Sequence, residues 1–368
     1  MSDWFTVQNV GAVPSPALLL YPDRVRENIR RMIRVAGGAS RLRPHLKTHK
    51  LAEVVRMQLD ESITKYKCAT IAEAEMAAGA GAMDVLIAYP MVGPNVERLL
   101  ELVKAFPATE FSCVADDADA VRHLSKTFSD SGRTLDVLLD VDCGQHRTGV
   151  EPGAEAMRLY RLMAASPGLR PGGLHVYDGH IHEPDLAKRT GLCAAAFSPV
   201  NEFHRELLAA GLPVPRIVAG GTPTLPIHAK NQFFECSPGT CVLWDFGYAS
   251  KFADLDFLIA AAVLTRVVSK PGANRLCLDL GHKAIAAENP PPRAQFLNLP
   301  EAAAISHSEE HLVVESAQAG TFAVGDWLYG VPRHICPTVA LYTEATVVCE
   351  GHATKHWRIT ARERRLTI

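Results

Sequence analysis

The sequence predicts an α/β fold: a (β/α)8 barrel followed by a mostly β domain. Strand-like apolar runs alternate with helical patterns over roughly 200 residues, which is typical of a parallel sheet. Eight such strands match a closed barrel of about 250 residues. After Asp245 the helical periodicity gives way to short β runs separated by Pro, Gly and Asn clusters, which indicates a second domain.

The predicted elements follow the chain in order. An apolar strand at 16–21 and a helical pattern at 24–35 come first. The barrel strands are predicted at 41–47, 65–70, 84–89, 110–115, 136–142, 173–178, 216–220 and 234–238. Helical patterns between them cover 51–59, 71–78, 96–105, 118–128, 154–165 and 192–210. Because eight strands complete the barrel, the strand at 16–21 is a ninth and belongs elsewhere. Further β runs are predicted at 258–268, 275–280, 311–314, 327–330 and 340–348.

Composition excludes several classes of protein. The 368 residues are 48% apolar, which supports a sizeable core. The net charge of -2 gives no bulk field that would recruit nucleic acid or a membrane, so small ligands fit better. Nine cysteines are scattered singly, which is typical of reduced thiols. With neither a signal peptide pattern nor an apolar run of membrane-spanning length, we expect a cytoplasmic protein.

The segment Arg43-Pro44-His45-Leu46-Lys47-Thr48-His49-Lys50 carries a candidate nucleophile. Lys47 should end the first barrel strand, where barrel enzymes place their chemistry. An amine attacks a carbonyl only when neutral, and nearby cations lower its pKa. Four cationic or potentially cationic side chains lie within four residues of Lys47: Arg43, His45, His49 and Lys50. The alternative interpretation is a solvated basic loop.

Two glycine–threonine loops follow the seventh and eighth predicted strands. Gly221 and Thr222 lie in the first loop, and Gly239 and Thr240 in the second. Glycine lets backbone N–H groups approach an anion closely, and threonine adds a hydroxyl donor, so both loops suit a phosphate. Strands one and eight are neighbours in a closed barrel, so Lys47 would share one mouth with these loops. This combination predicts pyridoxal phosphate held covalently by Lys47.

With these motifs the chain resembles the D-threonine aldolase and D-serine dehydratase family, pyridoxal-phosphate enzymes with a barrel of the alanine racemase type. The resemblance implies that Lys47 carries the cofactor, that Arg147 and Tyr177 contact it, and that the protein is a homodimer. It also implies that the first strand joins the β domain. We therefore expect a barrel domain at residues 22–250 and a β domain at 1–21 and 251–368. The matching segments are 43–50, 140–149, 177–180, 220–222, 238–240, 309–311 and 332–339.

His334 and Cys336 form a candidate metal pair. On a strand, residues i and i+2 point to the same side, so an imidazole and a thiolate could converge on one divalent ion. A chance pair is the alternative, but the family resemblance implies a metal here that holds the 3-hydroxyl of the substrate. A cysteine ligand favours zinc, with manganese or magnesium as alternatives. His311 is expected to take part in catalysis, beside the metal or as its ligand.

The resemblance implies a lyase that acts on 3-hydroxy D-amino acids. We expect the D-threonine aldolase type, which cleaves the substrate to glycine and an aldehyde. The alternative is a D-serine dehydratase, which forms a keto acid and ammonia, because Cys336 stands where the aldolases typically carry Asp. A pyridoxal-phosphate carrier and an amino-acid racemase are the remaining hypotheses. The expected partner is a D-amino acid, with no nucleic acid or membrane.

Overall fold

The computed structural model describes residues 3–364 and 367–368 and divides the chain into two compact units. The first, called here the barrel unit, comprises Arg30–Lys47, Ala52–Gly239 and Glu363–Ile368. The second, the β unit, comprises Met1–Ile29, Thr48–Leu51 and Thr240–Arg362. Across the described part of the chain, every helix is too short or too polar to cross a membrane.

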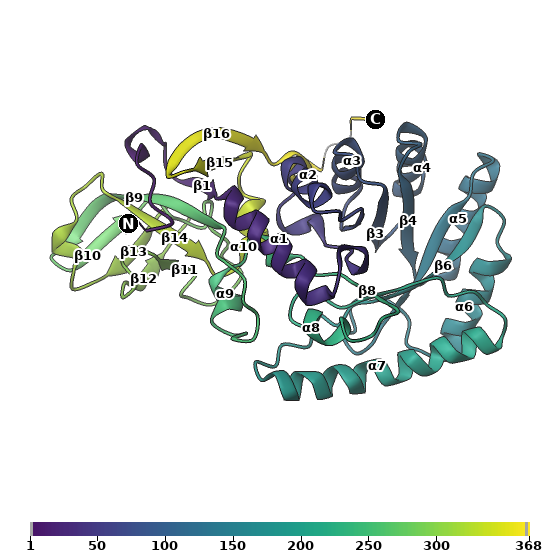
Figure 1. Cartoon of the computed structure of the whole chain (residues 1–368). Helices are drawn as coiled ribbons and strands as arrows, with labels where there is room; N and C mark the ends of the chain where they lie inside the picture. Colours follow the sequence, from purple (N-terminus) through teal and green to yellow (C-terminus); the bar gives the residue numbers. More distant parts are fainter. Residues whose placement is uncertain (1–2, 365–366) are drawn as a thin grey trace. The chain divides into compact units, whose positions relative to one another are not determined.

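The barrel unit is built on a parallel sheet in which strands adjacent in sequence are also adjacent in space (Figure 1). Consecutive pairing of this kind is what the alternation of strands and helices predicts. Most of these strands are buried along nearly their whole length, because helices cover a parallel sheet. They are β2 (Lys65–Cys68), β3 (Asp84–Pro90), β4 (Glu110–Ala115), β5 (Leu135–Val141), β6 (Leu169–Val176), β7 (Ile217–Ala219) and β8 (Phe234–Cys236).

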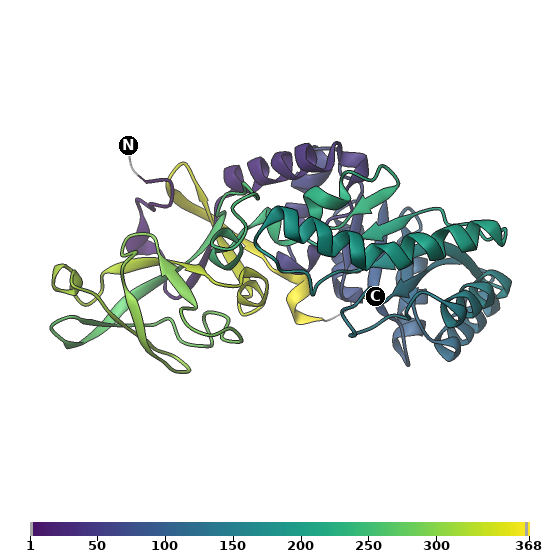
Figure 2. The same cartoon turned by 90° about the horizontal axis from the view of Figure 1, so that it is seen from below.

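Helices connect the strands, and their starts have local causes. The Thr70 hydroxyl accepts a hydrogen bond from the Glu73 N–H, and the Asp117 carboxylate accepts from the N–H groups of Asp119 and Ala120. Figure 2 shows the longest helix, α7, running along one side of the unit. The helices are α2 (Ala52–Asp60), α3 (Ile71–Gly79), α4 (Asn95–Ala105), α5 (Ala118–Asp130), α6 (Ala154–Ala165), α7 (Leu186–Ala209) and α8 (Leu225–His228).

The first predicted barrel strand is not a regular strand. Leu42 forms an isolated bridge with Cys236 of β8, and His45 forms one with Lys67 of β2. Pro44 lies between them and lacks the N–H that a strand ladder requires. The segment is nevertheless hydrogen-bonded to both edges of the sheet, because the Arg43 N–H donates to the Cys236 carbonyl at 2.8 Å and the Pro44 carbonyl accepts from the Lys67 N–H at 2.9 Å. It therefore closes the seven-stranded sheet.

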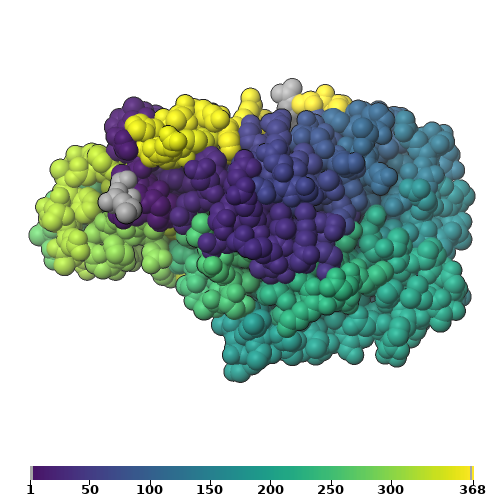
Figure 3. All heavy atoms as spheres, in the orientation of Figure 1, coloured from purple at the N-terminus to yellow at the C-terminus, as the bar shows by residue number. Residues whose placement is uncertain are grey.

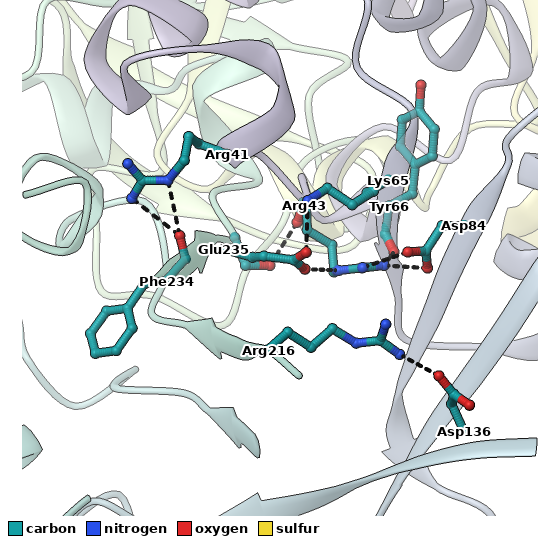
Figure 4. Close-up of polar contacts among 10 residues, drawn as sticks. Arg41, Arg43, Lys65, Tyr66, Asp84, Asp136, Arg216, Phe234 and Glu235 are labelled. Atoms are coloured by element: carbon teal, nitrogen blue, oxygen red, sulfur yellow. Dashed lines mark hydrogen bonds and ion pairs between the residues drawn. The ribbon is translucent and has the colours of Figure 1, made fainter. Parts of the chain in front are cut away.

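Arg43 reinforces this closure through its side-chain contacts (Figure 4). The side chain is completely buried. Its guanidinium donates to both carboxylate oxygens of Asp84, each at 2.7 Å, and its Nε donates to Glu235 at 2.6 Å. Lys65 pairs with the other oxygen of Glu235 at 2.6 Å. A bidentate, charge-assisted contact of this kind is geometrically specific. One side chain thus joins β3 and β8 to the closing segment.

The β unit contains a sheet of nine strands. Seven of them follow one another in hydrogen-bonded order, and the other two pair beside this path. Its helices α9 (Phe246–Ala249) and α10 (Ile335–Val339) are short, and α1 (Pro22–Ala36), which follows the first strand, begins in this unit and ends in the barrel unit. The strands are β1 (Ala17–Leu20), β9 (Ala261–Gly272), β10 (Arg275–Leu278), β11 (Ala294–Phe296), β12 (Ala303–His307), β13 (Leu312–Glu315), β14 (Trp327–Pro332), β15 (Glu344–Cys349) and β16 (His352–Arg358).

Strands from the N-terminal and C-terminal parts of the chain pair in this sheet. Strand β1 pairs parallel with β15, with Leu20 opposite Val347, and antiparallel with β9, with Leu19 opposite Ala262. Figure 3 shows the purple N-terminal residues beside the yellow C-terminal strands on the surface of this unit. The side chains of β1 are apolar, and three of its four residues are buried. The surplus strand of the sequence is therefore a central strand of the second sheet.

Candidate active site

Lys47 lies on the short 3-10 turn η3 (Leu46–Thr48) directly after the closing segment of the barrel unit. Its Nζ lies 5.7 Å from the centre of the Tyr177 ring, and the Arg147 guanidinium lies 5.0 Å from the same centre. Tyr177 follows the end of β6, and Arg147 lies in the loop after β5. The structure thus brings together three residues that the sequence had singled out: a candidate nucleophile, a cation and an aromatic ring.

A further lysine, Lys67, lies at the same ring and was not predicted. Its Nζ is 5.5 Å from the centre of the Tyr177 ring, and the residue is 2% exposed. Burial, and then the charge of Lys47, lower the pKa of Lys67 to about 7. We call Lys47, Lys67, Arg147 and Tyr177 the Tyr177 cluster.

Next to the cluster, Asp140 of β5 and His175 of β6 form a buried pair. The Nδ1 of His175 donates to the Asp140 carboxylate at 2.7 Å, whereas its Nε2 is buried and has no hydrogen-bond partner among the described residues. Burial lowers the pKa of His175, although the Asp140 charge opposes this shift. The pair holds one imidazole in a fixed orientation inside the barrel unit.

The cationic neighbours that the sequence placed around Lys47 have other roles. Arg43 is engaged by Asp84 and Glu235. His49 is completely buried, and burial lowers its pKa to about 3, so it carries no charge at neutral pH. The charge of Arg43 is thus balanced by two carboxylates, and His49 supplies none. The cations at the Tyr177 ring come instead from β2 and from the loop after β5.

The two glycine–threonine loops are also connected in the structure. The Gly239 N–H donates to the Thr222 hydroxyl at 3.1 Å, which ties the loop after β8 to the loop after β7. Thr224 accepts from the Gly221 N–H at 3.2 Å and donates to the buried Asp178 carboxylate at 3.0 Å. A side chain at Gly221 would bring a Cβ within 3.1 Å of the Tyr177 ring. Glycine at this position therefore keeps the space beside the ring open.

In the β unit, His334 and Cys336 do not lie on a strand, contrary to the prediction. His334 is the N-cap of α10, and Cys336 lies in the first turn of this helix. Burial lowers the pKa of His334, but its contacts with Cys336 and then Glu288 outweigh burial and raise it to about 9. The His334 Nδ1 donates to the Glu288 carboxylate at 2.6 Å, which leaves Nε2 as the ligand atom. An imidazole backed by a carboxylate, next to a thiol, is a donor set that fits a divalent metal.

Two threonines contact the thiol of this pair. The Thr48 hydroxyl lies 3.1 Å from the Cys336 Sγ, and the Thr240 hydroxyl lies 3.7 Å from it. Asp245 accepts from the Ile335 N–H at 3.0 Å and so anchors the start of α10. Thr240 was predicted as a phosphate-loop residue, whereas Thr48 was not singled out. Thr48 directly follows Lys47 in the sequence.

His311 lies on the turn between β12 and β13, and its side chain is exposed. Its carbonyl accepts hydrogen bonds from the N–H and hydroxyl of Ser308. Within residues 3–364 and 367–368, no contact joins its imidazole to His334 or Cys336. A catalytic role for His311 stays a prediction.

The residues present fit pyridoxal phosphate. The cofactor needs an amine to hold its aldehyde carbon, cations for its oxyanions and an open space for a flat ring. The barrel unit supplies the amine of Lys47, the charge of Arg147, the titratable amine of Lys67, and the gap that Gly221 leaves beside Tyr177. The unpartnered buried nitrogen of His175 adds a polar group that a ligand can engage.

Comparison with known proteins finds a matching family model for each of the two parts of the chain. Residues 21–245 match the alanine racemase N-terminal domain family, and residues 260–348 match a putative serine dehydratase domain. The chain is 30% identical to a D-threonine aldolase from Arthrobacter sp. over 95% of this chain and 93% of that protein. It is 25% identical to a D-threo-3-hydroxyaspartate dehydratase from Delftia sp. (strain HT23) over 93% of this chain and 96% of that protein.

A solved structure agrees with these relatives. The crystal structure of D-threonine aldolase from Filomicrobium marinum has a TM-score of 0.89 to this chain at 28% identity, and the match covers 96% of each chain. The predicted fold class, an alanine-racemase-type barrel with a mostly β C-terminal domain, is confirmed. The chain belongs to the alanine racemase N-terminal domain family and, within it, to the pyridoxal-phosphate-dependent lyases that include the D-threonine aldolases and D-serine dehydratases.

Proposed function

We propose that this protein is a D-threonine aldolase, which cleaves 3-hydroxy D-amino acids to glycine and an aldehyde with the help of a divalent metal. The observation that carries the proposal is the Tyr177 cluster, in which the candidate nucleophile Lys47 shares one aromatic ring with a second lysine, Lys67, and with Arg147. The metal pair His334 and Cys336 supports it, since a Lewis acid suits a substrate with a 3-hydroxyl group.

The main candidate residues have distinct roles in the proposed reaction. When bound, pyridoxal phosphate supplies an acceptor for the electron pair left at Cα. Lys47 would hold the cofactor, and Arg147 would offset negative charge near its ring. The connected loops that contain Thr222 and Gly239 would hold its phosphate. A divalent ion on His334 and Cys336 would polarise the 3-hydroxyl of the substrate.

A second candidate function is dehydration of the same substrate class to a keto acid and ammonia. Cys336 favours it, because the family resemblance gives cysteine to the dehydratases and aspartate to the aldolases at this position. The relative named as an aldolase is more similar to this chain, at 30% identity against 25% for the one named as a dehydratase. We therefore rank the aldolase first.

Product analysis separates the two functions. We expect the protein loaded with pyridoxal phosphate and zinc or manganese to convert D-threonine to glycine and acetaldehyde. Glycine, aldehyde, keto acid and ammonia should be scored separately, with D-serine and L-threonine as comparison substrates. Keto acid and ammonia without glycine would make the dehydratase the answer. No turnover, combined with stable cofactor binding, would favour a carrier protein.

Removal of the metal should abolish most of the activity. We expect chelation, His334→Ala and Cys336→Ala each to lower kcat by roughly 10²- to 10³-fold, because a Lewis acid contributes several kcal/mol to the transition state. Activity measured before and after re-addition of zinc or manganese checks this result for the wild type. Cys336→Asp retains an anionic ligand and should keep activity with manganese.

Cys349→Ala is the matched control for loss of a thiol, because Cys349 is also a half-buried free cysteine of the β unit. It should leave both activity and bound metal unchanged. A Cys336→Ala variant that binds metal as well as the wild type would contradict the proposed ligand.

Three finer features belong to the same proposal. Zinc is favoured as the metal because of the cysteine ligand. The nine cysteines are free thiols, which supports a reducing compartment such as the cytoplasm. A homodimer and a small D-amino acid as partner follow from the family resemblance.

A further inference from the structure

Lys67 belongs to the Tyr177 cluster but has no task in the proposed reaction. It ends β2, is 2% exposed, and lies 5.5 Å from the centre of the ring. Among the described residues, no hydrogen bond or ion pair engages its amine. An ammonium group buried without a partner is costly, so a buried lysine needs either a counter-ion or the neutral state.

The charges that face Lys67 give it no counter-ion of its own. Lys47 and Arg147 are positive and share its aromatic ring. Asp140 and Asp178 are the two carboxylates that act on it, and both are already engaged. Asp140 accepts from His175 at 2.7 Å, and Asp178 accepts from His228 at 2.6 Å and from Thr224 at 3.0 Å.

The site is therefore short of negative charge. Burial and Lys47 lower the pKa of Lys67 to about 7, so its amine is mostly neutral in the ligand-free protein above that pH. An oxyanion that arrives beside Tyr177 would stabilise the charged form, because an opposite charge at close range favours ionisation. Binding of the oxyanion and uptake of a proton are then linked.

We propose that Lys67 is an anion-binding residue that takes up a proton when an oxyanion binds beside Tyr177. The ligand is an aromatic or carboxylic oxyanion, which is either the phenolate of the cofactor or the carboxylate of the substrate. This inference rests on the proposed function, since it assumes that the Tyr177 cluster holds pyridoxal phosphate.

Calorimetric titration tests it without any turnover. The probe is pyridoxine 5′-phosphate, which retains the phenolic oxygen but lacks the aldehyde, so Lys47 cannot bond to it. Titrations at about pH 8 in two buffers of different ionisation enthalpy give the number of protons taken up. We expect up to about 0.9 proton per bound ligand in the wild type, because an amine with a pKa near 7 is about nine-tenths neutral at that pH.

Variants assign this proton to Lys67. Lys67→Met should lose the uptake and bind roughly 10- to 100-fold more weakly, as expected for a hydrogen bond to a charged group. Lys67→Arg stays charged, so it should retain affinity without taking up a proton. Above about pH 7 the wild-type affinity should fall by up to tenfold per pH unit, whereas Lys67→Arg should lack this dependence. Lys65→Met is the control, because Lys65 lies on the same strand but pairs with Glu235.

A second titration, of acetate into the cofactor-loaded enzyme, identifies the source of the oxyanion. Uptake with pyridoxine 5′-phosphate assigns Lys67 to the cofactor phenolate, and uptake only with acetate assigns it to a substrate carboxylate. Binding of both probes with proton uptake that is the same in the wild type, Lys67→Met and Lys67→Arg would overturn the inference alone. Failure of the wild type to bind pyridoxine 5′-phosphate would overturn the cofactor assignment as well.

Discussion

Lys47→Met should leave a folded protein that no longer retains pyridoxal phosphate through gel filtration. The side chain is similar in length but has no amine, so no covalent link to the cofactor aldehyde can form. We expect kcat for D-threonine cleavage to fall by at least about 10²- to 10⁴-fold, the range that a positioned proton-transfer group contributes. The visible absorption of the protein and the fraction of cofactor that stays bound check this result.

The matched control is Lys50→Met, three residues further along the same segment, which should keep both cofactor and activity. Borohydride reduction of the wild type followed by peptide mapping gives an independent result, because it fixes the cofactor to its lysine. A label on the peptide that contains Lys67 would reassign the nucleophile, since both amines lie within 5.7 Å of the Tyr177 ring centre.

Arg43→Met should destabilise the protein by about 3–5 kcal/mol, the usual effect of removing one partner from a buried ion pair. Asp84 and Glu235 would then keep their charges in largely buried positions, with side chains only 18% and 15% exposed. Lys65 would still pair with Glu235, but Asp84 would lose its bidentate partner. Urea unfolding followed by circular dichroism measures the difference in the free energy of unfolding between the wild type and the variant.

The control for this variant is Arg41→Met, which removes an arginine from the same segment. Arg41 donates mainly to backbone carbonyls, among them that of Phe234 at 3.2 Å (Figure 4). Its replacement should lower the free energy of unfolding by about 0.5–1.5 kcal/mol. An equal loss of stability in the two variants would show that the contacts of Arg43 with Asp84 and Glu235 add no stability beyond that of ordinary hydrogen bonds.

The contribution of Arg43 to the stability of the folded state should also depend on pH. Burial raises the pKa of Glu235, but the charges of Arg43 and Lys65 outweigh burial and lower it. A carboxylate with a lowered pKa in the folded state contributes stability above its unfolded pKa and loses this contribution as the pH falls. The difference in the free energy of unfolding between the wild type and Arg43→Met should therefore become smaller below about pH 4.3.

Much of the fold could be predicted because the buried side chains of its helices and strands recur at regular spacings in the sequence. Helix α4 was predicted at 96–105 and is observed at Asn95–Ala105, and β4 has the predicted bounds. Strands β12 and β16 were missed because most of their side chains are exposed, so no alternation marks them. They are held by pairing with β13 and β15, which a local pattern does not contain. The domain boundaries at 22–250 stay a prediction.

The site was predictable where a motif was local. Lys47, Arg147 and Tyr177 could be selected individually, and the structure gathers them at one ring. Lys67 could not be selected from the sequence, because a single charged residue in a short strand usually points into solvent. Its place follows from the bridge between His45 and Lys67, which joins segments that are distant in sequence. The strand geometry assumed for the spacing of His334 and Cys336 was wrong, because the five residues of α10 are too few to show helical periodicity.

The position of β1 between β9 and β15 imposes an order on synthesis. Its partner Val347 is translated 327 residues after Leu20, which takes on the order of 15 to 65 s at ordinary elongation rates. During that interval the ribosome releases the whole segment Ala52–Gly239, so the barrel can fold while Leu18, Leu19 and Leu20 still lack both neighbouring strands, which follow in sequence. An apolar strand with an open edge is a template for aggregation. The newly made chain therefore exposes this N-terminal strand to association with other chains until its last strands emerge.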